Sequence, residues 1–414
     1  RFDNAFCNFP LCGPSRASLM TGLYPDQTGH HRLRDLIRDH VPNAVTLPQA
    51  FHNQGYATAR VGKIYHYDNP RGIGTPGHDD AASWEERYFP KGIDKEIEDR
   101  IFSLRPGAFG ATLSWLAAEG TDEEHTDGLV ATKSIELLER YARDEQPFFL
   151  AVGFYKPHTP YVAPRKYFER YPQDQIRIPR VPENYHATLP APAVDGLIRF
   201  EVQNDLPDSL ARRAIQAYYA TISFLDAQVG RVLEALERLG LQDNTIVVFT
   251  SDHGYHMGEH GYYQKLTLFE DSGRIPLLIR DPDLPQPGVP TTTLVEMIDL
   301  YPTLTDLAGI EAPPYVAGRS LRPALEDPAA TVRTSALTQI EGGYTLRTPE
   351  YRYTRWGAGG ADLIELYDRR ADPAELRNLA REEGYRALIE RLDQELEARI
   401  GASATAPVGL EVRK

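Results

Sequence analysis

The sequence is poor in cysteine, has no basic block and contains no long hydrophobic run. Only two of its 414 residues are cysteines, Cys7 and Cys12, so a disulfide framework is excluded. No apolar stretch approaches the roughly 18 residues that cross a bilayer, and we expect no membrane span. The formal net charge is −14 and Lys and Arg are not clustered, so we expect no nucleic-acid partner. An anionic substrate would need a local positive site.

The cysteines and the start of the chain leave alternatives open. A Cys7–Cys12 disulfide is one arrangement, but we expect Cys7 to be a small buried hydrophobic residue. The sequence begins at Arg1 without a methionine and shows no leader-peptide pattern, which is compatible with an exported precursor that has lost its leader. The sequence leaves the oligomeric state open.

Alternating helices and strands predict an α/β fold with a mostly parallel sheet. Apolar runs predict strands at 56–61, 148–155, 245–250 and 276–280. Helices are predicted at 46–51, 129–141, 209–236 and 299–309, the last capped by Asp299. In the helix at 209–236, the apolar residues that step by three and four are Ile215, Tyr218, Ile222, Leu225, Val229, Leu233 and Leu236. Stretches rich in Pro and Gly at 68–77 and 156–207 are predicted to be long loops.

The character of the sequence changes after about Leu325. Short antiparallel strands are predicted at 344–346, 351–354 and 364–367, followed by a charged amphipathic helix at 385–400. We therefore expect a large α/β domain at 1–325 and a smaller C-terminal α+β subdomain at 326–414.

Three polar clusters follow three of the predicted strands. In chain order they are Gly62-Lys63 with His66, Lys156-Pro157-His158, and Ser251-Asp252-His253-Gly254. Ligands bind at the carboxyl ends of strands in sheets of this kind, so we expect the clusters to meet at one site. Such convergence is more informative than any one cluster alone.

The residue types in these clusters suit an oxyanion and a metal ion. The cations and hydrogen-bond donors for a tetrahedral oxyanion are Lys63, Lys156, Lys265, His66 and His158. Asp252 and His253 offer a hard carboxylate oxygen and an imidazole nitrogen to a metal. An isolated Asp-His pair is more often a solvated turn, but the position after a strand and beside two similar clusters favours metal ligation.

The segment from Cys12 to Arg16 opens a predicted helix, and Pro14 suits its first turn. A helix N-terminus offers free N–H groups and the positive end of a dipole, which favour an anion or a thiolate. Three interpretations fit these residues: Cys12 as a reactive thiol, Ser15 as a nucleophile, or a helix cap alone. The spacing by itself does not choose among them.

At this point the sequence resembles the formylglycine-dependent sulfatase family. The stretch CGPSRASLMTG, which runs from Cys12 to Gly22, matches the family signature C-x-P-S-R-x-x-L-x-T-G at every specified position. The other clusters occur in the family's order over essentially the whole chain. The run GKIYH from Gly62, the Asp252-His253 pair and the run GEHG from Gly258 are most similar to the iduronate-2-sulfatase branch, which includes bacterial members.

The resemblance implies an alkaline-phosphatase-like α/β sandwich and a sulfate-ester hydrolase. In the family a formylglycine-generating enzyme oxidises the cysteine, here Cys12, to an aldehyde that hydrates to a geminal diol. One hydroxyl attacks sulfur to form a covalent sulfate ester, and the other loses its proton and expels sulfate. The implied substrate is a small sulfated molecule such as a sulfated sugar. The implied location is periplasmic or secreted.

The resemblance also implies roles for the other site residues. Arg16 and Lys63 would hold the diol and its ionised oxygen, and His66 would handle its proton. His158 and Lys265 would bind sulfate oxygens, with Lys265 near the leaving-group oxygen. The same residues Lys63, His158 and Lys265 are therefore the predicted substrate-binding set.

The implied metal site contains Asp252, His253 and Cys12 as formylglycine, and the implied ion is Ca²⁺, with Mg²⁺ as an alternative. The family also has an N-terminal strand that ends in paired aspartates and supplies half of the metal ligands. This sequence begins at Arg1, a few residues before Cys12, so we expect an N-terminally truncated record of a working enzyme.

Two other functions compete with sulfate-ester hydrolysis. A phosphonate monoester or phosphodiester hydrolase uses the same nucleophile and a similar site. An inactive homologue that lacks the paired aspartates would act only as a binding protein. Substrate specificity is expected to depend on the loops at 67–125 and 159–207.

Several further polar and aromatic residues have ordinary structural interpretations. Asp26 is expected in a turn and Asp299 at a helix cap, and Trp356 is expected to pack in the C-terminal sheet. Four histidines either face substrate or lie in ordinary loops, namely His30, His31, His256 and His260.

Overall fold

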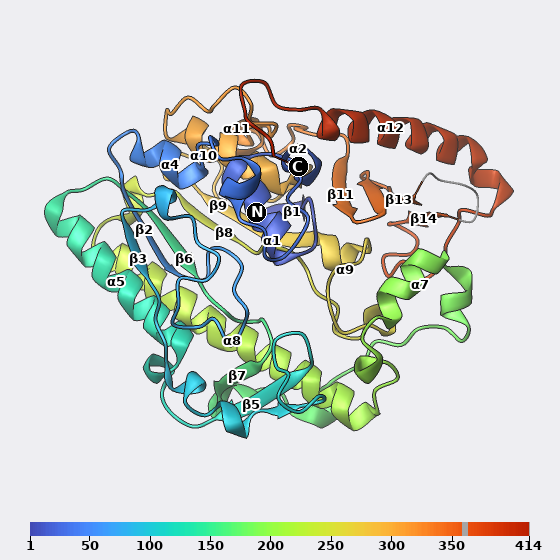
Figure 1. Ribbon diagram of the computed structural model, residues 1–414, viewed down its shortest axis with the longest axis horizontal. Coiled ribbons are helices and arrows are strands. Elements are labelled where there is room, and N and C mark those ends of the chain that lie inside the picture. The colour runs from blue at the N-terminus through green and yellow to red at the C-terminus, as the bar shows by residue number, and fades with distance from the viewer. Residues whose placement is uncertain (358–362, 414) are drawn as a thin grey trace.

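The first segment of the chain, β1 (Phe2–Phe6), lies inside a four-stranded sheet of order β10-β1-β9-β8 in the computed structural model, which describes residues 1–357 and 363–413 (Figure 1). β1 is parallel to β10 and antiparallel to β9, and β9 is antiparallel to β8. β1, β8 and β10 therefore run in one direction and end at the same edge of the sheet. The other strands are β8 (Val247–Thr250), β9 (Arg274–Arg280) and β10 (Thr291–Glu296).

Two three-stranded sheets contain the strands of the segment between β1 and α8. The sheet β3-β2-β6 is parallel throughout, and in β4-β5-β7 the strand β5 is parallel to β7 and antiparallel to β4. Their bounds are β2 (Ala57–Gly62), β3 (Glu86–Tyr88), β4 (Phe102–Ser103), β5 (Ser114–Ala118), β6 (Phe148–Gly153) and β7 (Tyr161–Pro164). The α/β class with a mostly parallel arrangement is confirmed. The four strands predicted in the large domain are found as β2, β6, β8 and β9, with ends shifted by a few residues.

The predicted long loop at 156–207 is not continuous. It contains β7 and two helices, α6 (Arg165–Phe168) and α7 (Ala191–Ile198), because short apolar stretches between its prolines pack into the core. The other helices before residue 330 are α1 (Cys12–Thr21), α2 (Pro25–Thr28), α3 (Ile37–His40), α4 (Leu47–His52), α5 (Thr126–Asp144), α8 (Asp208–Arg238), α9 (Glu270–Gly273), α10 (Leu300–Leu307) and α11 (Arg322–Glu326).

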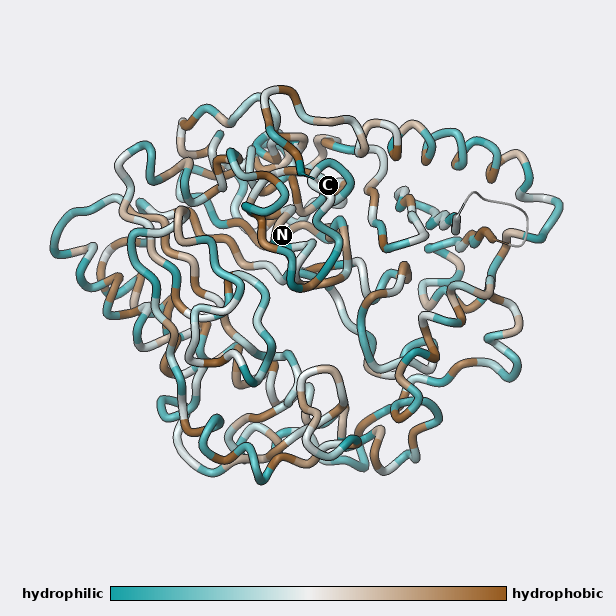
Figure 2. Tube along the Cα trace, in the orientation of Figure 1, coloured by the Kyte–Doolittle hydropathy of each residue, from teal (hydrophilic) through white to brown (hydrophobic). Residues whose placement is uncertain are grey.

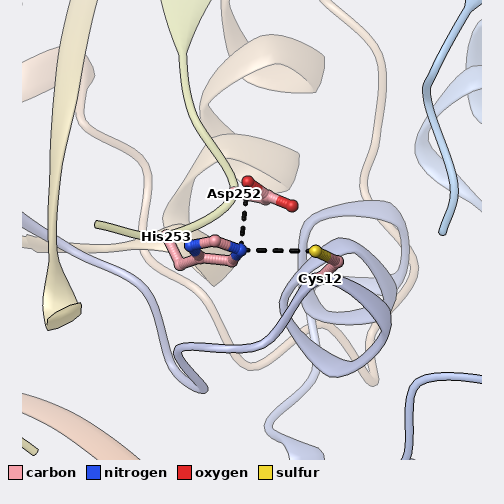
Figure 3. Close-up of side chains that lie close together, drawn as sticks. All are labelled: Cys12, Asp252 and His253. Carbon is pink, nitrogen blue, oxygen red and sulfur yellow. Dashed lines mark hydrogen bonds and ion pairs between the residues drawn. The ribbon is translucent and has the colours of Figure 1, made fainter. Parts of the chain in front are cut away.

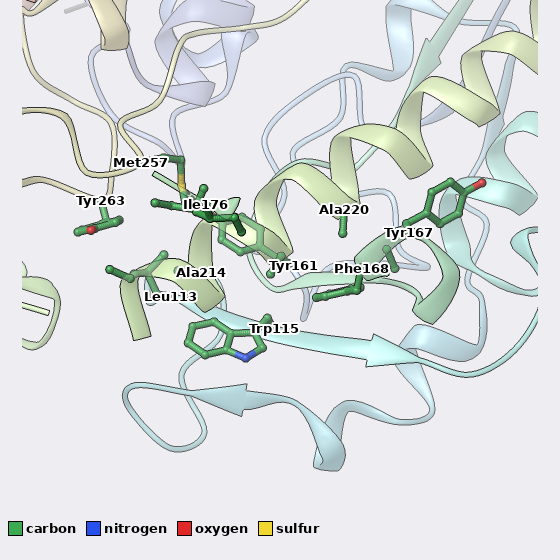
Figure 4. Packing of buried hydrophobic residues seen from close by; sticks show 14 of the residues in the cluster. Leu113, Trp115, Tyr161, Tyr167, Phe168, Ile176, Ala214, Ala220, Met257 and Tyr263 are labelled. Atoms are coloured by element: carbon green, nitrogen blue, oxygen red, sulfur yellow. Dashed lines mark hydrogen bonds between the residues drawn. The ribbon is translucent and has the colours of Figure 1, made fainter. Parts of the chain in front are cut away.

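The long helix α8 packs against α5, β5 and β7 (Figures 1 and 4). Its inner face contains small residues, among them Ala214 and Ala220, which lie in one core with Tyr161 and Trp115. Alanine lets the helix backbone approach the strands closely. The apolar stripe at 209–236 is consequently only partly buried, because Ile215 and Leu236 are buried whereas Ile222 and Leu233 are exposed.

The C-terminal part forms an antiparallel sheet of order β11-β12-β13-β14, followed by a long helix. The bounds are β11 (Ala336–Ile340), β12 (Gly343–Arg347), β13 (Tyr351–Trp356), β14 (Ile364–Asp368) and α12 (Arg386–Ala404). β11 was not predicted, and it joins this sheet to the segment before α1: the Gln339 N–H donates to the Asn8 carbonyl at 2.9 Å, and Thr338 Oγ1 donates to the Cys7 carbonyl at 2.6 Å. The division between residues 325 and 326 stays a prediction.

Three smaller expectations have clear outcomes. Both cysteines are free, and Cys7 is fully buried beside Phe2 and Ala5, as expected. Asp299 stands at the start of α10, but its carboxylate does not cap that helix; it binds the Arg333 guanidinium and the Arg319 N–H instead. Among the described residues, no helix is long and apolar enough to cross a membrane, and α12 is hydrophilic along most of its length (Figure 2).

Candidate active site

Cys12 is the first residue of α1, at the end of the turn that follows β1. No side chain caps this helix start, so backbone N–H groups of the first turn lack intrahelical partners near Cys12. The next residue must be glycine, because a Cβ at Gly13 would lie 2.7 Å from the Arg32 carbonyl oxygen. Gly22, with φ 68°, ends the helix in the left-handed conformation. The local sequence therefore places Cys12 at a site that favours negative charge.

The Cys12 side chain is buried and surrounded by nitrogen atoms. Its Sγ lies 3.3 Å from His253 Nε2 (Figure 3), and Lys265 Nζ donates to Sγ at 3.1 Å. Burial raises the pKa of the Cys12 thiol. The charges of Lys265 and Lys63 and a hydrogen bond with His158 outweigh burial and bring the pKa well below its usual value. The cluster therefore stabilises an anion at this position. Because the whole chain is acidic, an anionic substrate needs such a local positive site.

The ends of β2 and β6 bring Lys63 and His158 to this site. The two strands touch at their last residues, where a Cβ at Gly62 would lie 2.3 Å from the Gly153 carbonyl oxygen and the Lys63 N–H donates to that oxygen at 2.6 Å. Burial lowers the pKa of Lys63 to about 8, against the opposing charge of Cys12. Burial and the Lys63 charge lower the pKa of His158 to about 3, so its imidazole is neutral. The predicted convergence of strand ends is found.

Asp252 and His253 follow β8 and complete the cluster. Burial would raise the pKa of Asp252, but the Arg16 guanidinium, whose Nε donates to it at 2.8 Å, lowers the pKa to about 2. His253 Nδ1 lies 2.7 Å from the Gly254 carbonyl, which can only accept, so Nδ1 carries a proton and Nε2 is the nitrogen that faces Cys12. Ligand atoms of Cys12, Asp252 and His253 all lie within 4.8 Å of one another.

Two of the predicted residues have their side-chain contacts with groups other than Cys12. The His66 ring contacts His78, and its Nε2 lies 3.6 Å from Asp68 Oδ1. Lys156 Nζ donates to the Pro160 carbonyl at 2.9 Å and is therefore not one of the cations at the site. The proton-transfer role implied for His66 stays a prediction.

Arg16 reaches the site through other groups. It donates to the carbonyls of Lys63 at 3.0 Å and Ile64 at 2.7 Å in addition to Asp252. The guanidinium therefore joins the loop after β2 to the loop after β8. The role implied for Arg16 at the diol stays a prediction, and its observed contacts are those of a positioning residue.

One residue at the site was missed. Asn69 Nδ2 donates to the Thr159 carbonyl at 3.0 Å and lies 3.1 Å from His158 Nδ1, and that carbonyl lies 2.7 Å from the same Nδ1, so Asn69 and the Thr159 carbonyl together orient the His158 ring. Asn69 stands inside a loop rich in Pro and Gly, where no periodicity marks a functional residue; its position just before Pro70 was the sole signal.

The remaining candidates have structural partners. Asp26 accepts from Gln339 and Tyr344 at 2.7 Å each, and its Oδ1 lies 3.1 Å from His31 Nε2. His30 Nε2 lies 2.8 Å from the Asp35 carbonyl. Trp356 is buried, and its indole N–H donates to Glu365 at 2.7 Å, which agrees with sheet packing.

Comparison with known proteins identifies the family of the chain. A family model described as sulfatase matches residues 1–310, and a second, described as N-sulphoglucosamine sulphohydrolase, C-terminal, matches residues 258–401. Iduronate 2-sulfatase of Mus musculus is 31% identical over 94% of this chain and 86% of its own length.

Two solved structures share the fold. A protein solved in complex with its substrate D-glucosamine-2-N,6-O-disulfate is 22% identical, with a TM-score of 0.73 over 97% of this chain and 90% of its own. Phosphonate monoester hydrolase of Agrobacterium radiobacter is also 22% identical, with a TM-score of 0.81 over 100% and 92% of the two chains. The buried cluster around Cys12, the family model and the mouse relative together show that this chain belongs to the sulfatase family and is a sulfate-ester hydrolase.

Proposed function

We propose that this enzyme removes sulfate from a sulfated sugar and that formylglycine derived from Cys12 is its nucleophile. The observation that supports this most directly is the buried position of Cys12 at the start of α1, with Lys265 Nζ 3.1 Å from its Sγ. A sugar substrate is supported by the mouse relative, whose name is iduronate 2-sulfatase. The fold neighbour solved with a disulfated glucosamine agrees with this substrate class.

Formylglycine would supply a hydrated aldehyde, with one hydroxyl to attack sulfur and a second to expel sulfate. The chain's own residues would stabilise the charge that develops. Lys265 and Lys63 present ammonium groups in a water-poor site, where fixed charges act strongly on an oxyanion. The His158 ring would line the same site, held by contacts of its Nδ1 with the Thr159 carbonyl at 2.7 Å and with Asn69 Nδ2 at 3.1 Å. These groups form one wall of an anion site.

A divalent metal ion fits part of the donor set. Asp252 is ionised, and His253 Nε2 faces Cys12, so three donor positions surround one point. Ca²⁺ takes about 6–8 oxygen ligands, so Asp252, His253 and the oxygens of the modified Cys12 would be a partial shell. We propose Ca²⁺ by family resemblance. When bound, the ion would polarise sulfate oxygens. Arg16 would keep Asp252 in place through their 2.8 Å ion pair.

The test of the nucleophile is mass spectrometry of the peptide that contains Cys12, with a parallel assay of sulfate release. The chain would be produced with and without a formylglycine-generating enzyme, and cleavage of sulfated disaccharides and aryl sulfates would be measured. Aldehyde content and activity should rise together. Full conversion to aldehyde without cleavage of any sulfate ester would instead support a binding protein.

Phosphonate monoester hydrolysis is the second candidate, and the fold likeness to the Agrobacterium radiobacter enzyme favours it. The two functions share the anion site, so matched substrates are needed. We expect kcat/KM for 4-nitrophenyl sulfate to exceed that for 4-nitrophenyl phenylphosphonate. The reverse preference would replace the sulfatase proposal.

A further inference from the structure

A second group of metal-ligand side chains joins the loop that contains Asp252 and His253 to α9. His256 and His260 belong to the loop after β8, and Asp271 belongs to α9. His256 Nδ1 and His260 Nε2 each lie 3.9 Å from Asp271 Oδ2, and the three ligand atoms lie within 4.8 Å of one another. None of these three residues has a recorded contact with Cys12.

The other ring nitrogens are already engaged, which determines the direction of the free lone pairs. His256 Nε2 lies 2.8 Å from Thr267 Oγ1, which can accept its proton and leave Nδ1 unprotonated. His260 Nδ1 lies 2.5 Å from the Tyr185 hydroxyl, which donates to the Glu375 carbonyl at 3.3 Å and can therefore accept from Nδ1. Within the described part of the chain, His256 Nδ1 and His260 Nε2 have no hydrogen-bond partner.

Burial and charge oppose a simple His–Asp ion pair here. The His256 and His260 side chains are 0% and 1% exposed, whereas Asp271 is 41% exposed. Burial lowers the pKa of His256 to about 4 and that of His260 well below its usual value, so both rings stay neutral. Burial and the charges of Glu375 and Glu270 raise the pKa of Asp271 to about 6. Glu270 and Glu375 are themselves paired with Arg347, Arg352 and Arg369, so in the described ranges of the chain the two lone pairs and the Asp271 carboxylate face one another without a cation of their own, and a metal ion would satisfy all three.

We propose that His256, His260 and Asp271 bind a first-row transition-metal ion of the Zn²⁺ type. Two imidazole nitrogens and one carboxylate oxygen are a common donor set for such ions. In a tetrahedral site the ligand atoms would be roughly 3.4 Å apart, so each 3.9 Å separation must close by about half an ångström. The half-exposed Asp271 side chain has the freedom to make that movement, and its open side leaves a fourth position to water.

The position of this ion gives it a structural effect on the active site. The Gly254 N–H donates to the Ser272 carbonyl at 2.9 Å, and the His256 N–H donates to the Gln264 carbonyl at 3.0 Å. The loop that begins at Asp252 and ends at Lys265 is therefore folded back on α9. An ion between His256, His260 and Asp271 would clamp this loop to α9 and so position both the metal-ligand pair and the anion-binding lysine.

The test requires that the site near Cys12 be removed first. The double variant Cys12→Ser/Asp252→Asn lacks two of the three candidate ligands there. The full chain with these changes would be stripped with a chelator and titrated with Zn²⁺ by calorimetry. We expect one equivalent to bind and the Tm to rise. Adding Asp271→Asn, which changes a half-exposed side chain, should weaken Zn²⁺ binding at least 100-fold and abolish the Tm rise.

Two controls make the outcome specific. Adding Asp283→Asn instead removes the same charge from an exposed loop position and should leave Zn²⁺ binding unchanged. Replacing Zn²⁺ by Co²⁺ should give a visible spectrum of imidazole and carboxylate ligation that Asp271→Asn removes. The proposal is overturned if the double variant binds no Zn²⁺, or if Asp271→Asn leaves the titration and the Tm shift unchanged. In that case a proton or a water molecule occupies the space between the two rings.

Discussion

Asp252 and Asp299 follow β8 and β10, the two outer strands of the sheet that contains β1, and each lies in a group of buried charges. Around Asp299 the charges are paired. Arg333 donates from Nε to Asp299 at 2.8 Å and lies 3.5 Å from Glu296, and the three side chains are at most 4% exposed. Around Asp252 the Arg16 ion pair is accompanied by Lys63 and Lys265, which have no carboxylate partner within ion-pair distance among the residues the structure describes.

This difference separates a structural cluster from a binding cluster. The two buried carboxylates Glu296 and Asp299 are balanced by two guanidinium groups, Arg333 and Arg399, so this group needs no further ligand. The buried ammonium groups of Lys63 and Lys265 have the Cys12 thiolate as their nearby anion, and once Cys12 is converted to formylglycine a bound anionic group would balance them instead. Asp252 and Asp299 both follow a strand, so position along the chain does not distinguish the two groups. They differ in whether the buried cations have carboxylate partners.

The largest loss of activity is expected when Cys12, the residue next to Lys63 and Lys265, is replaced. Cys12→Ala removes the precursor of the nucleophile and should lower kcat/KM for a sulfate ester roughly 10⁴-fold or more. Cys7→Ala is the matched control, because Cys7 is equally buried but packs among hydrophobic residues, and its activity should stay near that of the parent. Substantial activity in Cys12→Ala would show that the cluster around Cys12 is not the catalytic site.

Breaking the paired cluster should affect stability and leave the chemistry intact. Arg333→Met leaves Asp299 buried without a cation and leaves Glu296 with Arg399 alone, so the free energy of unfolding should fall by about 3–5 kcal/mol. Urea denaturation measures this change. Arg322→Met is the control, because Arg322 is 47% exposed in its pairs with Asp306 and Glu326, and its loss should cost less than about 1 kcal/mol. Equal losses in the two variants would show that pairing does not stabilise this cluster.

The unpaired cluster should respond in the opposite way. Lys265→Met removes a buried charge that has no carboxylate partner, so kcat/KM should fall about 10²-fold while the free energy of unfolding does not decrease. Lys133→Met is the control, since Lys133 forms an exposed ion pair with Glu136. Steady-state kinetics and urea denaturation on the same samples test both halves of the prediction. A stability loss as large as that of Arg333→Met would make Lys265 a structural residue.

The sequence predicts the binding cluster better than the fold around it. The residues after β2, β6 and β8 could be grouped because ligands bind at the carboxyl ends of strands, and Lys63, His158 and Asp252 do come together, although β8 belongs to a different sheet from β2 and β6. Lys156 lies within two residues of His158, yet its ammonium group turns to the Pro160 carbonyl. Residue type and position along the chain do not determine the direction of a side chain in an irregular loop.

The missed elements depend on contacts distant in sequence. β1 is five residues long and includes Asp3 and Asn4, and it is stabilised by β9 and β10, more than 260 residues later in the chain. The inner face of α8 is rich in alanine, which lets the helix pack closely on β5 and β7, and a search for an apolar stripe of large side chains does not reveal this. Asp299 was placed correctly at a helix start, but its partner Arg333 comes from a loop that local sequence does not connect to it.

The smallest expected effect concerns the titration of Lys63, whose pKa burial lowers from 10.5 to about 8. Below that pH the Lys63 ammonium can bind sulfate, so kcat/KM should fall to half its plateau value near pH 8. Because conversion of Cys12 to formylglycine removes the thiolate charge that raises the pKa of Lys63, this midpoint should lie at or below pH 8. Stability should change in the opposite sense, because the folded chain releases this proton at a lower pH than the unfolded chain and becomes more stable between about pH 8 and 10.5. Lys63→Met should flatten both profiles at a lower activity. A variant that retains the alkaline limb would show that another group, and not an unpaired lysine, limits the reaction.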